Sequence, residues 1–397
     1  MNTKQKLESN LKNIMVQNIF LEPFFWGPIL ILTLQNLAHM SLQEIYTLEA
    51  VAIILCLIID IPTGALSDII GRKKMLIIAQ IFLFVSFLSF AFMQNPIHAW
   101  CANILWAIGA AFKSGTDKAL LQETCIALGK DKTFYRKYTG RAQGYRLLLM
   151  AISAPVTTWV ASCDLRAPMY LSIPTLIIPL ICVFKLTEPP REIRELTVRE
   201  HTRQMKEGLK DVYKNNRIVW IIAYTCIISL TSKIWFFTYN PYCEEVGLKL
   251  SEFGLIFFFL NLVAWASSRY GHLVENKIGD KGTMLILIPM IGIPVLLMGL
   301  IPLPFMAYMV LFQNVVRGMY GPFIDNVTER FLKNDTRATV LSVQSSVIYV
   351  VAAISLWLFG HVVDQTGLLK SLIILGTVTL GAYLVLMYYW PRLFKKD

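Results

Sequence analysis

Runs of about twenty apolar residues recur from one end of this 397-residue chain to the other. At about 1.5 Å of rise per residue, one such run can cross a hydrocarbon layer roughly 30 Å thick as a single helix. Hydrophobic residues make up 55% of the chain and charged residues only 16%, against about 25% charged residues in an ordinary soluble domain. Since a soluble fold of this size cannot bury so much apolar surface, the sequence predicts an all-α, polytopic membrane protein.

The apolar runs divide into twelve predicted spans. They cover residues 16–38, 42–68, 73–94, 98–126, 136–162, 166–186, 217–242, 251–275, 283–301, 304–331, 338–363 and 369–391. Lys and Arg cluster in the loops on one side, whereas the opposite loops hold only Arg166, Lys249 and Lys370. By the positive-inside rule, this bias predicts that both termini are cytoplasmic. The net charge of +11 thus marks membrane edges and a lipid partner, not a nucleic-acid interface.

A polar segment over residues 187–216 separates spans six and seven. Its amphipathic pattern is typical of a cytoplasmic linker helix near the membrane surface, with a calmodulin-like partner site as the alternative. We therefore predict an N-terminal six-helix bundle over 1–186 and a C-terminal six-helix bundle over 217–397. The glycine-to-acid spacing of Gly64 and Asp68 returns in the second half as Gly271 and Glu275. Such an internal echo indicates two pseudo-symmetric bundles from a duplicated transporter fold.

The segment GALSDIIGRKKM, residues 64–75, lies between predicted spans two and three. It resembles the signature G-x-L-x-D-x-x-G-R-K/R-K/R of the major facilitator superfamily, and the preceding DIPTG is similar to the E-x-P-T-G of one prokaryotic branch. The twelve-span layout extends the resemblance over the whole chain. The resemblance implies a secondary transporter of the bacterial inner (cytoplasmic) membrane, in which two bundles alternate around a site at the midplane.

The same resemblance implies a gate at the cytoplasmic side. Similar proteins place Gly64 where helix two packs closely on helix eleven, Asp68 near the amino end of that helix, and Arg72 in a charge relay. Glycine permits close approach of helices in a bilayer, and a carboxylate is stabilised near a helix amino terminus. The predicted gate residues are Gly64, Asp68, Gly71, Arg72, Gly271 and Glu275.

Two positions depart from the family pattern. Asn103 stands where many proton-driven members carry an arginine in helix four, and only Ala154-Pro155 remains of the G-P-x-x-G-G of drug antiporters. The sequence alone therefore establishes neither proton coupling through helix four nor export.

Charged residues inside the spans are candidates for the site, because a charge at mid-bilayer is costly unless it faces a partner or a wet cavity. The residues predicted to line the substrate route are Lys113, Arg146, Lys233 and Arg317, together with Asn314 beside Arg317 and Trp26 in a proline-kinked first helix. With four bases against fewer acids at the same depth, the sequence predicts a net positive cavity. Such a cavity favours an anionic or carboxylate-bearing solute.

Three acids, Glu22, Asp60 and Asp117, are predicted to carry protons, because burial favours the protonated form of a carboxyl group. Hydrogen bonding between helices is the alternative role for Glu22 and Asp60. Asp117 lies one helical turn after Lys113, so that a purely structural ion pair is the alternative there.

Other classes of function lack their motifs in this chain. There is no Walker loop GxxxxGK[ST] for ATP, no HExxH and no GxSxG, and the seven cysteines are scattered, so we expect neither an enzyme nor a metal site nor a bound cofactor. A multidrug efflux antiporter for hydrophobic or cationic compounds is one alternative. A non-transporting membrane sensor or structural protein is another. We expect a monomer that binds a small-molecule substrate together with protons.

Overall fold

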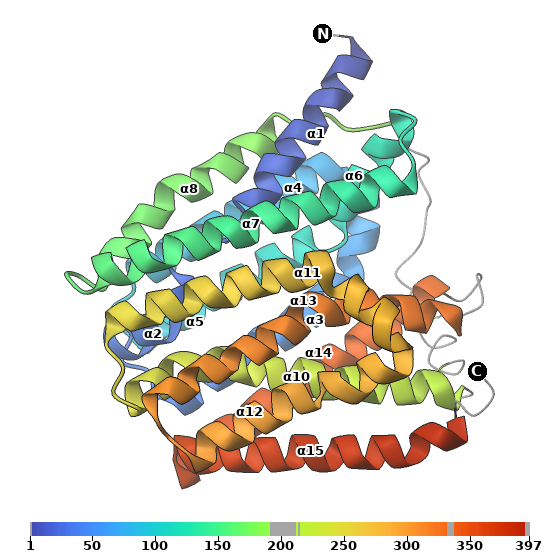
Figure 1. The fold of residues 1–397 in the computed structure, drawn as a ribbon. Helices are drawn as coiled ribbons and strands as arrows, with labels where there is room; N and C mark the ends of the chain where they lie inside the picture. Colours follow the sequence, from blue (N-terminus) through green and yellow to red (C-terminus); the bar gives the residue numbers. More distant parts are fainter. Residues whose placement is uncertain (1, 191–211, 213–214, 332–336, 394–397) are drawn as a thin grey trace. The chain divides into compact units, whose positions relative to one another are not determined.

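A computed structural model describes residues 2–190, 212, 215–331 and 337–393, and within these ranges the chain forms helices and no strand (Figure 1). Its contacts divide the chain into two compact units. Unit 1 comprises Met1–Met40 and Val51–Val198, and unit 2 comprises Ser41–Ala50 and Arg199–Asp397. Most of the linker predicted over 187–216 lies outside the described residues.

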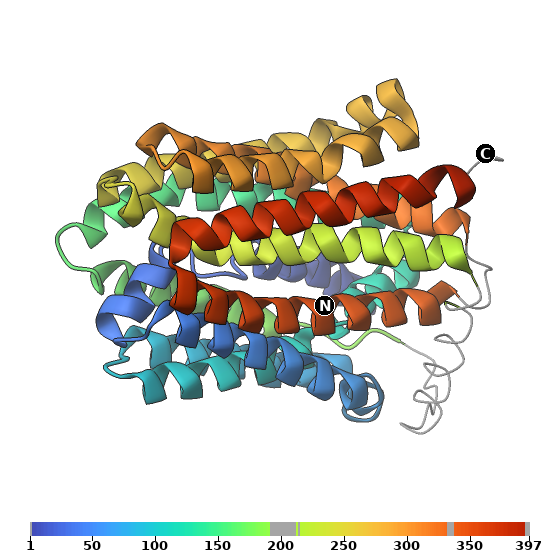
Figure 2. The same cartoon turned by 90° about the horizontal axis from the view of Figure 1, so that it is seen from below.

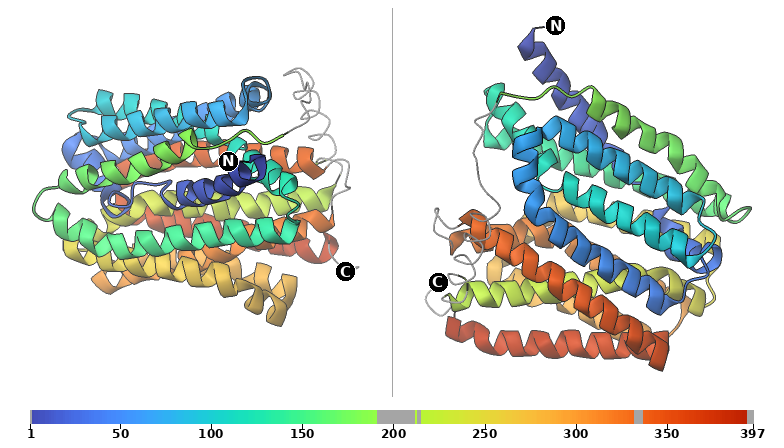
Figure 3. Two further views of the ribbon diagram at one scale, coloured as in Figure 1. Left: turned by 90° about the horizontal axis from the view of Figure 1, so that it is seen from above. Right: turned by 180° about the vertical axis from the view of Figure 1, so that it is seen from behind.

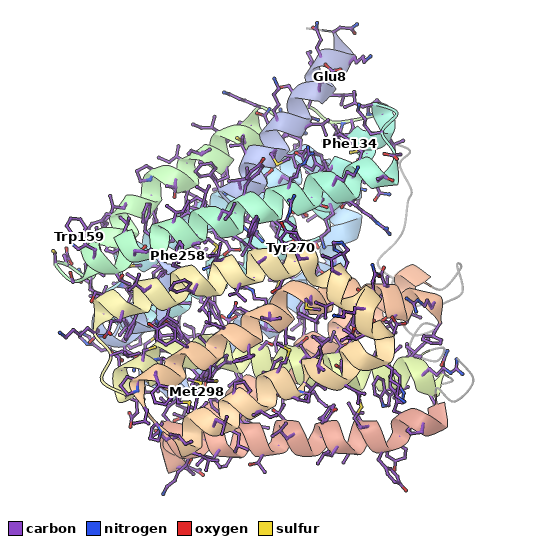
Figure 4. The ribbon with its side chains drawn as sticks, viewed as in Figure 1. Glu8, Phe134, Trp159, Phe258, Tyr270 and Met298 are labelled. Carbon is purple, nitrogen blue, oxygen red and sulfur yellow. The ribbon has the colours of Figure 1, made fainter. Side chains whose placement is uncertain are left out.

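Seven helical stretches of the described chain are long and apolar enough to cross a membrane. They are Leu42–Asp60, Arg72–Ala91, Ala167–Phe184, Asn216–Glu245, Leu250–Leu300, Val340–Thr366 and Leu368–Pro391. Large apolar side chains also stand exposed on helix faces: Trp159, labelled in Figure 4, is 69% exposed and Leu384 is 65% exposed. Because soluble proteins rarely present extended apolar faces to water, these helices belong to a multi-pass membrane protein.

Unit 1 is built from helices that pack around one apolar core. The helices are α1 (Thr3–Ile19), the short 3₁₀ helix η1 (Gly27–Ile29), α2 (Leu30–Leu37), α3 (Leu42–Ile70, in unit 1 from Val51), α4 (Arg72–Ala91), α5 (Pro96–Lys113), α6 (Thr116–Ala127), α7 (Lys132–Ala161) and α8 (Ala167–Phe184). α1 lies between α7 and α8, and α4 packs on α5 and α8 (Figure 3). Buried Ile14, Leu76, Leu121 and Val183 join α1, α4, α6 and α8 in this core.

The first predicted span is broken rather than kinked. α1 begins at Thr3, ahead of the predicted start at residue 16, and helix resumes only at Gly27. Pro23 lies inside the interruption and cannot donate a backbone hydrogen bond, whereas Pro28 stands in the first turn of η1, where a donor is not needed. The Ser153 hydroxyl of α7 donates to the Phe24 carbonyl over 2.9 Å, and the Phe25 N–H donates to the Ser172 hydroxyl of α8 over 3.2 Å. These side chains satisfy backbone groups that a bilayer would leave unpaired.

The fourth predicted span is also interrupted. α5 ends at Lys113 and α6 begins at Thr116, because Gly115 takes a φ of 70°, a left-handed conformation that glycine adopts at little cost. The prediction of one continuous helix over residues 98–126 is therefore wrong at this break.

Unit 2 contains the remaining helices. They are α10 (Asn216–Glu245), α11 (Leu250–Leu287), α12 (Pro289–Leu300), the 3₁₀ helix η2 (Pro304–Met309), α13 (Val310–Arg330), α14 (Arg337–Thr366) and α15 (Leu368–Leu393), joined by the first turns of α3. α10 packs on α14 and α15, with α15 running alongside it in Figure 2, while α11 packs on α13 and α12 on α15. A Cβ added at Gly318 of α13 would lie 2.6 Å from the Ala264 carbonyl of α11, so that these two helices touch backbone to backbone.

The two units repeat one pattern of helix pairs. α1 pairs with α7 and α4 with α8 in unit 1, and the corresponding pairs in unit 2 are α10 with α14 and α12 with α15. A glycine with positive φ marks the same position of each unit: Gly71, at 105°, precedes α4, and Gly279, at 70°, interrupts α11. The resemblance between the two glycine-containing segments in the sequence thus corresponds to the same backbone feature.

Candidate functional site

A cavity of about 400 Å³ lies inside unit 1, where both broken helices are interrupted. Residues of α4, α5, α6 and α8 and the non-helical segment after α1 line it. Much of its wall is aromatic, formed by Trp26, Phe87, Phe90 and Trp106. Its volume falls within the range of about 300–1,000 Å³ that is typical of small-molecule sites.

Trp26 forms a fixed part of this wall. Its indole Nε1 donates to the Thr33 hydroxyl over 2.9 Å, and its ring packs on Phe90 and Phe87 with centroid distances of 4.8 and 5.5 Å. The predicted substrate-route residue therefore lines the cavity, with an indole orientation set by protein contacts.

Lys113 and Asp117 form an ion pair at the edge of the cavity, across the break at Gly115. The Lys113 Nζ lies 2.7 Å from Asp117 Oδ2, and both side chains are mostly buried. The other carboxylate oxygen of Asp117 accepts from the backbone N–H of Lys118 over 2.7 Å. Both carboxylate oxygens thus have donors, as a charge withdrawn from water requires.

A second pair is looser. The Arg146 Nη1 of α7 lies 3.5 Å from Glu22 Oε1, and Glu22, which also lines the cavity, has a side chain 42% exposed. The Nε of Arg146 is buried and has no hydrogen-bond partner among the described residues. This pair is therefore the more easily separated of the two.

A third pair lies in unit 2. The Lys233 Nζ of α10 lies 2.6 Å from Glu49 Oε1 at the start of α3, and it also stands 5.4 Å from the centre of the Phe237 ring. The buried Tyr46 hydroxyl, one turn earlier on α3, shares a hydrogen bond of 2.7 Å with Thr238. The first turns of α3 are thus fixed to α10 by one ionic and one neutral contact.

These pairs change the charge balance expected from the sequence. Lys113, Arg146 and Lys233 each have an acidic partner within their own unit, so the premise of uncompensated midplane bases does not hold. Arg317 is exposed and does not line the cavity of unit 1. Asn314 is buried and donates to the Val310 carbonyl of its own helix over 3.2 Å.

Asp60, the third predicted proton carrier, does not line this cavity. It lies on α3, where its backbone carbonyl accepts from the Thr63 hydroxyl over 2.7 Å. The structure therefore brings Glu22 and Asp117 to one cavity and leaves Asp60 apart from it.

The predicted gate at Arg72 is an ionic cluster around the amino end of α4. The Arg72 Nε donates to Glu123 Oε1 of α6 over 2.6 Å. The carboxylate of Glu188, beyond α8, accepts from the backbone N–H groups of Arg72 and Lys73, each over 2.8 Å. The amino end of a helix carries a partial positive charge and unpaired N–H groups. The Glu188 carboxylate therefore compensates the charge and accepts hydrogen bonds from two of these N–H groups.

Gly71 is required by the backbone at this cluster. Its φ of 105° is a conformation that residues with a side chain rarely adopt, and this backbone conformation, rather than lack of space, requires the glycine. Gly64 and Asp68 belong to α3, but the surroundings of the Asp68 side chain and of Gly64 lie outside what the structure describes.

The corresponding residues of unit 2 have other neighbours. A Cβ at Gly271 of α11 would lie 2.6 Å from Met319 Cγ, so this glycine permits close packing on α13. Glu275 is half-buried on α11, and one turn further Asp280 forms an ion pair with Arg330 of α13.

Sequence reasoning missed three residues that complete the clusters, Glu49, Glu123 and Glu188, and a fourth, Gln80 of α4, which lines the cavity. Glu49 and Glu123 lie inside predicted spans, so the rule applied to the other intramembrane charges also identifies them. Glu188 follows α8 in sequence, and only the fold brings it to α4. Gln80 is uncharged and carried no signal of its own.

The described helices form a multi-pass fold that holds a cavity of small-molecule size, and the comparison with known families identifies its class as a membrane transport protein rather than an enzyme. The family model of the Major Facilitator Superfamily matches residues 19–356, and the chain belongs to this superfamily.

Solved structures of transporters share its fold. A nucleoside transporter, NupG, superposes with a TM-score of 0.75 at 13% identity, over 98% of this chain and 99% of that one. A POT family transporter in complex with a thioalcohol-conjugated peptide gives 0.73 at 13% identity, over 98% and 97% of the two chains. A D-xylose-proton symporter gives 0.71 at 15% identity, over 96% of each chain. No curated protein sequence matches this chain.

Proposed function

We propose that this protein is a secondary active transporter that moves a small organic solute by alternating access, coupled to protons. The observation that carries the proposal is the cavity of unit 1, which brings paired charges and aromatic rings to the interruptions of two helices. Broken helices that line a midplane cavity are typical of the sites of secondary transporters. Since the chain has no Walker loop, an ion gradient supplies the energy.

The proposal includes a topology. Twelve spans form two six-helix bundles, over 1–186 and 217–397, with the linker over 187–216 and both termini in the cytoplasm of a bacterial cell. A monomer in the inner membrane carries the activity. The gate residues Gly64, Asp68, Gly71 and Arg72, with Gly271 and Glu275, hold the cytoplasmic side closed in one state. The charge bias of the loops and the cluster at α4 support this arrangement.

Proton coupling is assigned first to Glu22. Its pair with Arg146 is the longest of the three, and its side chain is the most exposed of the paired acids. The longer and more exposed Glu22–Arg146 pair separates more easily than the Lys113–Asp117 pair, whose two charges are withdrawn further from water. Asp117 and Asp60 are the remaining candidates.

The anionic solute expected from the sequence has weaker support once the ion pairs are known. Because three of the four predicted midplane bases, Lys113, Arg146 and Lys233, are paired with acids, an anion has less to gain than the sequence alone indicated. The aromatic lining also suits hydrophobic cations, so a multidrug efflux antiporter is the alternative function.

Transport by purified protein in liposomes under an imposed pH gradient tests the proposal. Organic anions, neutral ring compounds and hydrophobic cations are offered in parallel, with protein-free liposomes and liposomes at equal pH as controls. We expect flux of one class that depends on the gradient and is lost in Glu22→Gln, while Glu8→Gln, on the exposed part of α1 (Figure 4), retains it. Flux that does not depend on the pH gradient would refute proton coupling. If none of the three solute classes shows flux, transport of these solutes is refuted.

A further inference from the structure

We propose that a cavity of unit 2 binds the headgroup of an anionic phospholipid. This cavity, of about 870 Å³, lies where α11 bends at Gly279 and where α13 and α15 end, at the right-hand end of α15 in Figure 1. The membrane-spanning stretch Leu368–Pro391 ends at the cavity, so that the cavity lies at the level of the lipid headgroups. Such a lipid site goes beyond the proposed transport function and does not depend on it.

Two bases line the cavity against one acid. Lys281 is exposed and forms no ion pair with another side chain that the structure describes. Arg330, whose side chain is 57% exposed, is paired with Asp280 through one guanidinium nitrogen. Since a guanidinium has five N–H donors, this contact fixes its position and leaves donors for an anion. A phosphodiester, which accepts charge-assisted hydrogen bonds from both kinds of base, fits this pair.

Aromatic side chains shape the wall of the cavity. Trp390 packs edge-on against Trp220 of α10, with ring centroids 4.9 Å apart, and the Phe331 ring lies 5.2 Å from the Arg217 guanidinium. Trp390 and Phe331 both line the cavity. Tryptophan is enriched at the depth of the lipid headgroups, and Arg217 adds a further positive charge beside the cavity.

The cavity adjoins an apolar surface that faces the lipid. Met284 lines the cavity, and the next residue, Leu285, is 41% exposed. The Tyr383 hydroxyl of α15 donates to the Leu285 carbonyl over 2.9 Å, and the following residue, Leu384, is exposed as well. The acyl chains of a lipid can therefore follow α11 and α15 while its phosphate lies between the two bases. A soluble phosphate would gain only the polar contacts, and basic pockets between membrane helices are typical sites for anionic headgroups.

Native mass spectrometry of the full-length protein in detergent, titrated with lipid, tests this proposal. The probes are phosphatidylglycerol and phosphatidylcholine with the same acyl chains. We expect phosphatidylglycerol to bind the wild type more tightly than phosphatidylcholine. Lys281→Gln should weaken phosphatidylglycerol binding about fivefold, which is the contribution of one base near a membrane surface. Lys281→Arg keeps the charge and should keep the affinity.

Lys277→Gln is the matched control. Lys277 is exposed on the same helix, four residues before Lys281, but it does not line the cavity, so that the affinity should be nearly unchanged. The proposal is overturned if both lipids bind the wild type equally, if Lys281→Gln binds phosphatidylglycerol as tightly as the wild type, or if Lys277→Gln loses as much affinity. Glycerol 3-phosphate is the soluble probe, and if it binds the wild type as tightly as phosphatidylglycerol, the cavity is a site for soluble phosphates and not for lipid.

Discussion

Replacing Glu188 by Ala should loosen the amino end of α4. The carboxylate accepts two backbone hydrogen bonds of 2.8 Å there, and loss of a helix-capping side chain costs about 0.5–2 kcal/mol. The charge interaction with the helix end adds about 0.3–1 kcal/mol when exposed and more when partly buried. With half-buried Glu188, we expect a loss of about 1–2 kcal/mol, or roughly a 5- to 30-fold greater population of the opened end.

Hydrogen exchange followed by mass spectrometry measures this directly. Peptides that cover the first turn of α4 should exchange faster by about the same factor in Glu188→Ala, while peptides from α15 should be unchanged. Glu44→Ala is the matched control, because Glu44 accepts from the Ser41 N–H over 2.8 Å at the start of α3 and should affect that helix end only. Unchanged exchange at α4 in Glu188→Ala would show that the carboxylate does not hold this helix end.

Three further predictions follow from backbone geometry and capping. Gly71→Ala should lower the free energy of unfolding by on the order of 1–3 kcal/mol, because φ is 105° there. Gly140→Ala, with open space around it in α7, should raise stability slightly. Thermal unfolding in detergent compares the two variants, and equal melting temperatures would contradict the argument. Gly318→Ala, whose Cβ would meet a backbone oxygen at 2.6 Å, should lower the melting temperature more than Gly271→Ala, whose Cβ meets a movable side chain; the reverse order would count against backbone contact of α11 and α13. The hydrogen bond from the Phe134 N–H lowers the pKa of Asp131. The ionised Asp131 side chain therefore stabilises the fold above its unfolded pKa of about 3.9, and this stabilisation is lost as the pH falls through the lower folded pKa. The difference in unfolding free energy between wild type and Asp131→Asn should shrink below about pH 4, and a difference independent of pH would contradict this.

The sequence predicts helices well where apolar residues are uniform, and the predicted span 369–391 corresponds to α15, Leu368–Leu393. Prolines are a weaker guide, because the structure is interrupted around Pro23, where only a kink was predicted, whereas Pro155 and Pro241 lie inside continuous helices. The break at Gly115 was missed, because a single glycine within an apolar run is compatible with continuous helix. Only the backbone geometry shows whether such a glycine interrupts its helix.

The candidate site was predicted only in part, because the sequence shows which charges lie inside the spans but not which of them pair. Intramembrane charge is visible in a sequence, and so Lys113, Asp117 and Glu22 were found and do lie at one cavity. Glu49 and Glu123 also lie inside predicted spans, but only the fold shows that they pair with Lys233 and Arg72. The predicted positive cavity counted Lys233 without its partner Glu49.

The broken first helix has a consequence for how the protein enters the membrane. Its apolar part, Gly27–Leu37, is one of the shorter apolar helices of the described chain, whereas a helix needs about 20 apolar residues to span the bilayer by itself. The serines of α7 and α8 pair with the peptide groups of Phe24 and Phe25, just before this segment. We therefore expect stable integration of the first helix into the membrane to follow synthesis of α7 and α8.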